Sequence, residues 1–162
     1  MLVTNFQEEV VPVPNSNIFI VSEPSSALDF ETYYHLRFDV LRKPWGQPKG
    51  SEIDETDSTS IHAFIKINNE VVAVARLHFI DHSVAQIRYM GVDPNQQGKG
   101  LGKLVIAYLE GKAIENNKKI MILHARETAI KFYENCGYKI KEKSYLMWNQ
   151  IQHFLMEKDL EK

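Results

Sequence analysis

The sequence has 162 residues, 44% of them hydrophobic and 25% charged, with a formal net charge of −2. This balance is typical of a folded globular protein, and it excludes a strongly basic molecule that charge alone would hold on nucleic acid or an anionic membrane. The single cysteine, Cys136, excludes an internal disulfide and a cysteine-based zinc site.

The length fits one domain, so we predict a single domain over residues 1–162. Residues 1–20 lack the basic start and the apolar core of a signal peptide. No apolar run approaches the ~20 residues that a membrane helix needs. These features predict a cytoplasmic protein with no membrane segment.

Three elements are predicted in the first third of the chain. Residues 1–16 form an irregular arm, because prolines in it oppose a regular central strand. Residues 17–21 are predicted to form a short strand, and residues 28–43 carry apolar side chains at helical spacing until Pro44 ends the helix. A long loop over residues 44–59 follows, and a loop of this length is often functional. Its four carboxylates are Glu52, Asp54, Glu55 and Asp57.

The middle of the chain predicts three strands and a helix. Strands over residues 61–67 and 71–80 flank the segment 68–70, whose two asparagines tolerate the positive φ of a hairpin turn. A third strand is expected over residues 84–92. After a glycine-rich stretch, apolar residues at helical spacing predict a helix from about residue 101 to 117.

The last part of the chain alternates between strands and one helix. Residues 120–123 predict a short buried strand, and residues 129–136 predict a helix that Gly137 ends. Two closing strands are expected over residues 138–143 and 151–158. The order of elements predicts one mixed α/β domain with a largely antiparallel front half.

The glycine-rich stretch before the second predicted helix is the most informative segment. Gly98, Gly100 and Gly102 let the backbone approach a ligand closely. The helix that follows presents unpaired N–H groups and the positive end of its dipole. Lys99 and Lys103 add positive charge. This combination predicts a phosphate-binding loop; the alternative is a glycine-rich turn that only leads into a helix.

Three phosphate-binding motifs compete for this stretch. A Walker A loop fails because Asp93 and Gly100 stand where it needs a glycine and a serine or threonine. A dinucleotide fingerprint fails because Lys103 occupies its third small position. The pattern Gln/Arg-x-x-Gly-x-Gly/Ala is met by Gln97, Gly100 and Gly102. With this pattern the segment resembles the phosphate loop of the GNAT N-acetyltransferase family, which cradles the coenzyme A pyrophosphate.

Two further segments support the resemblance. Residues 129–138 resemble the second cofactor helix of the family, and residues 85–92 resemble the strand that pairs with the pantetheine arm. The resemblance covers roughly residues 17–160. Residues 36–46 and the ending around residues 152–156 are similar to a subgroup of small bacterial acetyltransferases. The resemblance implies an α+β fold in which helices flank a central, twisted and mostly antiparallel sheet.

The resemblance also implies an activity. It points to an N-acetyltransferase that moves an acetyl group from acetyl-CoA, its cosubstrate, directly to a primary amine of a small molecule or a peptide. The alternatives are a non-catalytic module that binds acyl-CoA, and an enzyme that acetylates protein N-termini or lysines. We expect no nucleic-acid or membrane partner, and a homodimer by analogy with similar enzymes.

The site residues follow from the matched motifs. Tyr133 occupies the place of the catalytic tyrosine, which protonates the departing thiolate; alternatively it is a core tyrosine. Backbone N–H groups near Gly91, which suits a bulge, are expected to form an oxyanion hole. Many relatives have asparagine where Arg126 stands. The residues that the resemblance assigns to the cofactor are Met90, Gly91, Val92, Gln97, Gly98, Lys99, Gly100, Leu101, Gly102, Lys103, Arg126, Ala129 and Phe132.

The general base and the acceptor site stay open. The acidic loop either attracts a cationic acceptor or is simply solvated. Arg76 and Arg88 interrupt apolar strands, so they either line the acceptor cleft or pair with local carboxylates. His78 and His82 lie where a strand meets a turn, so we predict no metal site. The candidates for the base are His62, Glu52, Asp54, Glu55, Asp57 and His153.

Overall fold

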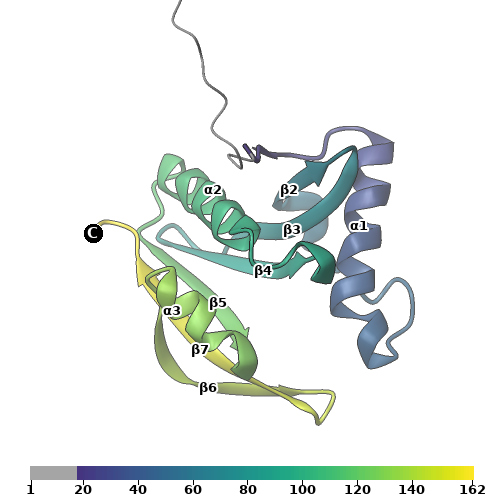
Figure 1. Ribbon diagram of the computed structural model, residues 1–162. Coiled ribbons are helices and arrows are strands. Elements are labelled where there is room, and N and C mark those ends of the chain that lie inside the picture. Colours follow the sequence, from purple (N-terminus) through teal and green to yellow (C-terminus); the bar gives the residue numbers. More distant parts are fainter. Residues whose placement is uncertain (1–17) are drawn as a thin grey trace, which may run out of the picture.

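The computed structural model describes residues 18–162, and the predicted arm over residues 1–16 lies outside them. Helices pack on a sheet whose strands come from the whole of this range (Figure 1). The elements are β1 (Val21–Ser22), α1 (Ala27–Leu41), β2 (Ile61–Ile67), β3 (Glu70–Phe79), β4 (Val84–Val92), α2 (Leu101–Glu115), β5 (Ile120–Arg126), α3 (Ile130–Asn135), β6 (Lys139–Met147) and β7 (Ile151–Asp159).

The strands form one seven-stranded sheet in the order β1-β2-β3-β4-β5-β7-β6. Neighbouring strands are antiparallel, except that β4 and β5 run parallel. The crossover between these two strands contains α2, as a parallel connection requires. The predicted α+β architecture, a mostly antiparallel sheet flanked by helices, is therefore confirmed.

Alternation along β2 and β3 explains why two helices cover this half of the sheet. One face carries small or aliphatic residues such as Ala63, Ala75 and Leu77, which belong to the core cluster beneath α2. The opposite face carries Phe64 and Val74, which pack with residues of α1. Because successive strand residues point to opposite faces, near-continuous apolar runs are buried on both sides.

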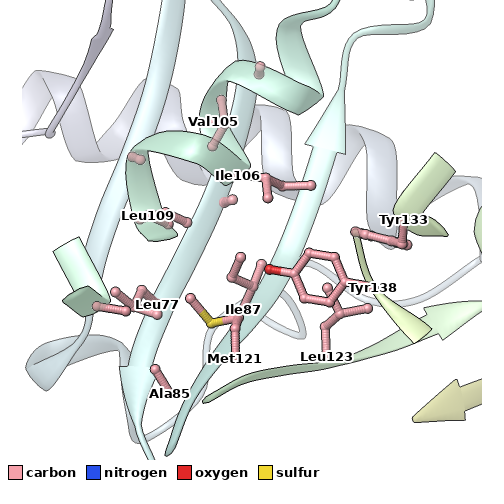
Figure 2. Packing of buried hydrophobic residues seen from close by; sticks show 14 of the residues in the cluster. Leu77, Ala85, Ile87, Val105, Ile106, Leu109, Met121, Leu123, Tyr133 and Tyr138 are labelled. Atoms are coloured by element: carbon pink, nitrogen blue, oxygen red, sulfur yellow. The ribbon is translucent and has the colours of Figure 1, made fainter. Parts of the chain in front are cut away.

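The core extends across the sheet beneath α2. Figure 2 shows Val105, Ile106 and Leu109 of α2 directed toward side chains of β3, β4 and β5, including Leu77 and Met121. The cluster continues to the aromatic residues that follow, at the end of α3 and the start of β6. One core thus joins both halves of the sheet and fixes the position of α2 over β4.

The predicted turns and helix ends are largely confirmed. Asn68 and Asn69 have φ of 52° and 66°, as the hairpin prediction required. The helix predicted to end near residue 117 ends at Glu115, and Asn117 has a φ of 61°. Gly137, with a φ of 96°, follows α3. The β6–β7 hairpin turns at two residues of positive φ that the sequence reading did not single out, Trp148 and Asn149.

Three predicted strands have the wrong length, and one of them, predicted over residues 138–143, extends to Met147 as β6. The first strand was expected over residues 17–21, but β1 contains only Val21 and Ser22. The strand predicted over residues 120–123 continues to Arg126, because β5 pairs with β7 along its whole length, up to Arg126 opposite His153. Polar side chains in its second half concealed this continuation, although burial alternates along the strand.

A bulge in β4 opens the sheet. Val74 pairs with Gly91 whereas Arg76 pairs with Arg88, so two residues of β4 face one residue of β3. The first of these two, Tyr89, has a φ of 53°. The expectation that Gly91 forms the bulge is wrong. Gly91 instead faces α1, where a Cβ would be in contact with a methyl group of Val40 at 3.4 Å.

Candidate active site

A cleft of about 860 Å³ lies where β4 and β5 separate. The two strands pair only where residues Val84–Gln86 of β4 lie beside residues Ile120–Ile122 of β5. Beyond this point the edge of β4 that faces β5 has no strand partner in the described part of the chain. The divergence of the two strands is visible in Figure 1. The cleft is lined by residues of β4, β5 and α3, by the start of α2, and by parts of α1, β6 and β7.

The predicted phosphate loop lies at one end of the cleft. Gly98 and Gly100 have φ of 82° and 78°, and a Cβ on either would meet nothing within 4 Å. Gly100 is the N-cap of α2, with no side chain capping the helix. Among residues 18–162, no acceptor is found for the N–H groups of Leu101, Gly102 or Lys103. This glycine loop therefore presents unpaired donors beside open space, which is what an anionic group needs.

Gly102 of α2 lies close to side chains of β4 and α3, which also line the cleft. A Cβ on it would lie 2.9 Å from Met90 Cε and 2.9 Å from Phe132 Cζ, so a larger residue here would force the ends of these two side chains to move. All the residues assigned to the cofactor except Lys99 line the cleft. Lys99 does not line the cleft itself, and its ammonium donates to the side-chain oxygen of Gln96, which does.

Tyr133 lies on α3 and is only 8% exposed. It packs edge-on against Phe132 and Tyr138 and belongs to the hydrophobic core, yet it also lines the cleft. Tyr133 is thus a core tyrosine that also borders the cleft, and its role as the catalytic acid stays a prediction. Burial raises the pKa of the Tyr133 phenol well above its ordinary value, so the hydroxyl stays protonated at neutral pH. Such a group can donate a proton but cannot act as a base.

His153 is the one base candidate that lines the cleft. Its Nδ1 lies 2.9 Å from the carbonyl oxygen of Ile151. A carbonyl can only accept, so Nδ1 carries the proton in the neutral ring and Nε2 is left as an acceptor. Burial is the main cause that lowers the pKa of His153, and the nearby Arg126 adds to it. The imidazole is therefore neutral at neutral pH and stacks on Tyr145, with ring centroids 4.5 Å apart.

Sequence reasoning missed His124 and Tyr145, which also line the cleft. His124 Nδ1 lies 3.0 Å from the hydroxyl of Ser144, and burial lowers the pKa of His124. The rings of His124 and Tyr145 lie 5.2 Å apart. The alternation of side chains along a strand could have predicted His124. It lies two residues before Arg126, which the resemblance assigns to the cofactor, so the two share one face of the strand.

The other five base candidates do not line the cleft. Both ring nitrogens of His62 are engaged, at 2.9 Å from the Tyr33 hydroxyl and 2.8 Å from the Asp57 carbonyl oxygen. Glu52 is buried and its carboxylate accepts the N–H of Gly50. Glu55 is exposed away from the cleft.

The carboxylates of the acidic loop form ion pairs inside the protein. Asp57 lies 2.8 Å from Arg37 and 3.2 Å from Arg76. Asp54 lies 2.6 Å from Arg76 and 3.2 Å from Arg88. The expectation of a solvated loop is therefore wrong for these two residues. Arg76 pairs with local carboxylates only, whereas Arg88 does so and also lines the cleft.

Arg126, the departure from the family pattern, lines the cleft and lies with its guanidinium 5.8 Å from the ring centre of Trp45. Burial is the main cause that lowers the pKa of Arg126, and the positive charge of Arg42 adds to it. The two arginines are thus close enough to repel each other. The ring centroids of Trp45 and Trp148 lie 6.4 Å apart, so the loop after α1 contacts the β6–β7 turn.

The family model of the acetyltransferase (GNAT) family matches residues 30–138, which is more than half of the chain. The chain belongs to this family. It is 25% identical over 126 residues to the uncharacterized N-acetyltransferase YjcF of Bacillus subtilis, covering 78% of this chain and 89% of that protein. As a member of the family the protein is an acyltransferase, and GNAT enzymes use acetyl-CoA as cosubstrate.

Solved structures of GNAT proteins share the fold. A GNAT family acetyltransferase from Elizabethkingia anophelis with acetyl-CoA bound superposes with a TM-score of 0.74 at 15% identity, covering 88% of this chain and 99% of that one. An aminoglycoside 6′-N-acetyltransferase complexed with coenzyme A superposes with a TM-score of 0.74 at 15% identity, covering 87% of this chain and 97% of that one. No helix within residues 18–162 is long and apolar enough to cross a membrane.

Proposed function

We propose that this protein transfers an acetyl group from acetyl-CoA directly to the primary amine of a small molecule or a peptide. The observation that carries this proposal is that one cleft contains the glycine loop at one end, a protonated buried phenol on its wall and a neutral histidine beside it. The membership of the GNAT family and the acetyl-CoA bound to a structural relative support it.

The cleft fits acetyl-CoA, which supplies the acetyl group as a thioester. Residues of the glycine loop have the open space and unpaired N–H groups that a pyrophosphate requires. Lys103 adds a positive charge at the start of α2. The open edge of β4 leads from this loop toward the bulge, so its backbone groups at Met90–Val92 are available to the pantetheine arm and to the thioester carbonyl.

Tyr133 is proposed as the general acid. Its phenol is kept protonated by burial, and it lines the same cleft as the glycine loop. A proton from this hydroxyl to the thiolate sulfur would make the leaving group neutral as the thioester bond breaks. The hydroxyl makes no hydrogen bond to any residue in the range 18–162 that would compete for this proton.

His153 is proposed as the general base, acting directly or through a water molecule. Its Nδ1 proton is committed to the carbonyl of Ile151, so Nε2 is the nitrogen that can take a proton from the attacking amine. The lowered pKa of His153 keeps this nitrogen unprotonated at neutral pH. Tyr133 and His153 thus have opposite proton roles at the same pH, which a direct transfer requires.

Calorimetric titration of acetyl-CoA tests the cofactor assignment. Gly100→Glu would place a carboxylate in the glycine loop, and we expect it to weaken binding by more than about tenfold. Gly46→Glu is the matched control, because Gly46 also has a positive φ, of 67°, and open space at its Cβ, but lies outside the cleft. Binding unchanged by Gly100→Glu, or absent from the wild type, would contradict the assignment.

A thiol-release assay tests turnover. Release of coenzyme A with amines or with peptides would support the enzyme and separate its acceptor classes. Binding of acetyl-CoA with no turnover across both classes would favour a non-catalytic module that binds acyl-CoA.

A further inference from the structure

One part of the cleft is lined by cations and by no carboxylates. Arg42, Arg88 and Arg126 line it there, from the end of α1, from β4 and from the end of β5; we call this part the arginine end. Arg88 precedes the bulge, about 13 Å along the strand from Val92, after which the glycine loop follows. Within residues 18–162, no aspartate or glutamate lines the cleft.

The positive charge of the arginine end is only partly compensated. Behind it, three arginines share the carboxylates of Asp54 and Asp57, and Arg88 is the member that faces the cleft. Arg42 is held by the carbonyl oxygens of Ser51 and Leu41, each 3.1 Å away, rather than by a carboxylate. Neither Arg42 nor Arg126 forms an ion pair within the described part of the chain.

Aromatic rings hold these guanidinium groups in place. The Arg42 guanidinium lies 5.3 Å from the ring centre of Trp148, and that of Arg126 lies 5.8 Å from the ring centre of Trp45. Arg88 lies 5.1 Å from the ring centre of Tyr89. A ring contacts the face of a guanidinium and leaves its N–H groups available for hydrogen bonds. The arrangement therefore positions donors without neutralising them.

A cationic acceptor would be repelled by this end of the cleft, whereas a carboxylate or phosphate would gain charge-assisted hydrogen bonds. The same cations disfavour the ammonium form of a bound amine, because like charges lower its pKa. An amine held near them is therefore more readily neutral, which is the form that attacks a thioester. The positive charge thus serves both selection and reactivity.

We propose that the acceptor is a primary amine that also carries an anionic group, a carboxylate or a phosphate, and that Arg88 binds this group together with Arg42 and Arg126. The inference rests on the proposed acetyl transfer in the same cleft. It predicts discrimination against polyamines and aminoglycosides, which carry further positive charge and no anion, and against lysine side chains of proteins, which carry no anion beside the amine. The aminoglycoside enzyme among the structural relatives does not bear on this choice, because at 15% identity it shows the fold alone.

Matched acceptor pairs test the inference with the wild-type protein. Each amino acid is compared with its amide, and 2-aminoethyl phosphate with ethanolamine, with putrescine as a dication. We expect kcat/KM, calculated on the unprotonated amine, to be at least about tenfold higher for the anionic member. Equal or lower values for every anionic member, or turnover of putrescine alone, would overturn the inference. The carboxylate and phosphate arms show which anion is bound.

Arg88→Gln tests the residue. We expect it to raise KM for the anionic acceptor about tenfold and to lower kcat/KM for the amide by a smaller factor, so that the discrimination between the two falls. Arg88→Lys should restore part of the discrimination, and Lys143→Gln, an exposed cation outside the cleft, should change nothing. Unaltered discrimination in Arg88→Gln would overturn the assignment. Acetyl-CoA titration of every variant separates this failure from failure of the proposed function, in which acetyl-CoA itself would not bind.

Discussion

The rings of Tyr133 and Tyr138 lie 6.1 Å apart at an angle of 77°, yet only Tyr133 lines the cleft. Both phenols are buried, and burial raises the pKa of each above its ordinary value. The Tyr138 hydroxyl is buried without a hydrogen-bond partner in the described part of the chain. The two tyrosines thus share an environment and differ in access to the cleft, which makes them a matched pair for mutation.

Tyr133→Phe is expected to lower kcat by about 100-fold or more, because it removes the proton donor for the leaving thiolate. The affinity for acetyl-CoA should stay within about threefold, since the ring and its packing are retained. Steady-state thiol release and calorimetric titration measure the two quantities. A kcat close to that of the wild type would refute the role of Tyr133 as the acid.

Tyr138→Phe is the control for this prediction and carries one of its own. It should leave kcat and KM unchanged, because the Tyr138 hydroxyl does not reach the cleft. It should also raise the free energy of unfolding by about 1 kcal/mol, since a buried hydroxyl with no partner is removed. Urea denaturation of the two proteins measures the difference. A loss of stability would show that the hydroxyl is bonded in solution.

His153→Gln is expected to change the pH profile as well as the rate. The pKa of His153 is lowered from 6.5, so in the wild type kcat/KM, calculated on the unprotonated amine, should fall only as the pH drops below about 6.5 and the base becomes protonated. In His153→Gln this acidic limb should disappear, with kcat/KM at neutral pH lowered by about 100-fold. An acidic limb that persists unchanged in the variant would assign it to another group, for which His124→Gln is the comparison.

The sequence predicted the glycine-loop end of the cleft better than the rest of its lining, and the reason is physical. The glycine loop is a local motif, in which positive φ and unpaired N–H groups depend on neighbouring residues, so Gly98 and Gly100 could be read directly. Tyr133 was found through a similarly local motif. The rest of the lining brings together Arg42, Arg88 and His153, which are distant in the sequence, and only the sheet order places them around one space.

The same difference between local and long-range contacts explains which parts of the fold could be predicted from the sequence. The Asn68–Asn69 turn and the ends of α2 follow from local propensity, and they agree with expectation. The second half of β5 does not, because its strand geometry is stabilised by pairing with β7 from the end of the chain. The partners of the acidic loop were also invisible, since whether Asp54 and Asp57 are solvated depends on arginines contributed by α1, β3 and β4.

Asp57 is expected to matter for stability and not for chemistry directly. It is buried between Arg37 and Arg76, at 2.8 Å and 3.2 Å, so Asp57→Ala would leave the buried guanidinium of Arg37 with no carboxylate partner and that of Arg76 with Asp54 alone. We expect a loss of about 3–5 kcal/mol in the free energy of unfolding. The exposed pair of Lys66 with Asp29 is the control, and Lys66→Ala should cost less than about 1 kcal/mol. Equal losses in the two variants would contradict the assignment.

Asp54 gives a prediction for acid stability. Burial acts to raise the pKa of Asp54, but hydrogen bonds from Arg76 and Thr56 outweigh it, and the pKa in the folded state lies well below 3.8. A carboxyl with a depressed folded pKa stabilises the protein fully above its unfolded value and loses that contribution as the pH falls toward the folded value. The stability advantage of the wild type over Asp54→Asn should therefore be constant above about pH 5 and shrink below about pH 4. Urea denaturation at pH 6, 4 and 3 measures the difference in the free energy of unfolding between the two proteins. A difference that stays constant or widens on acidification would show that the Arg76–Asp54 ion pair does not form in solution.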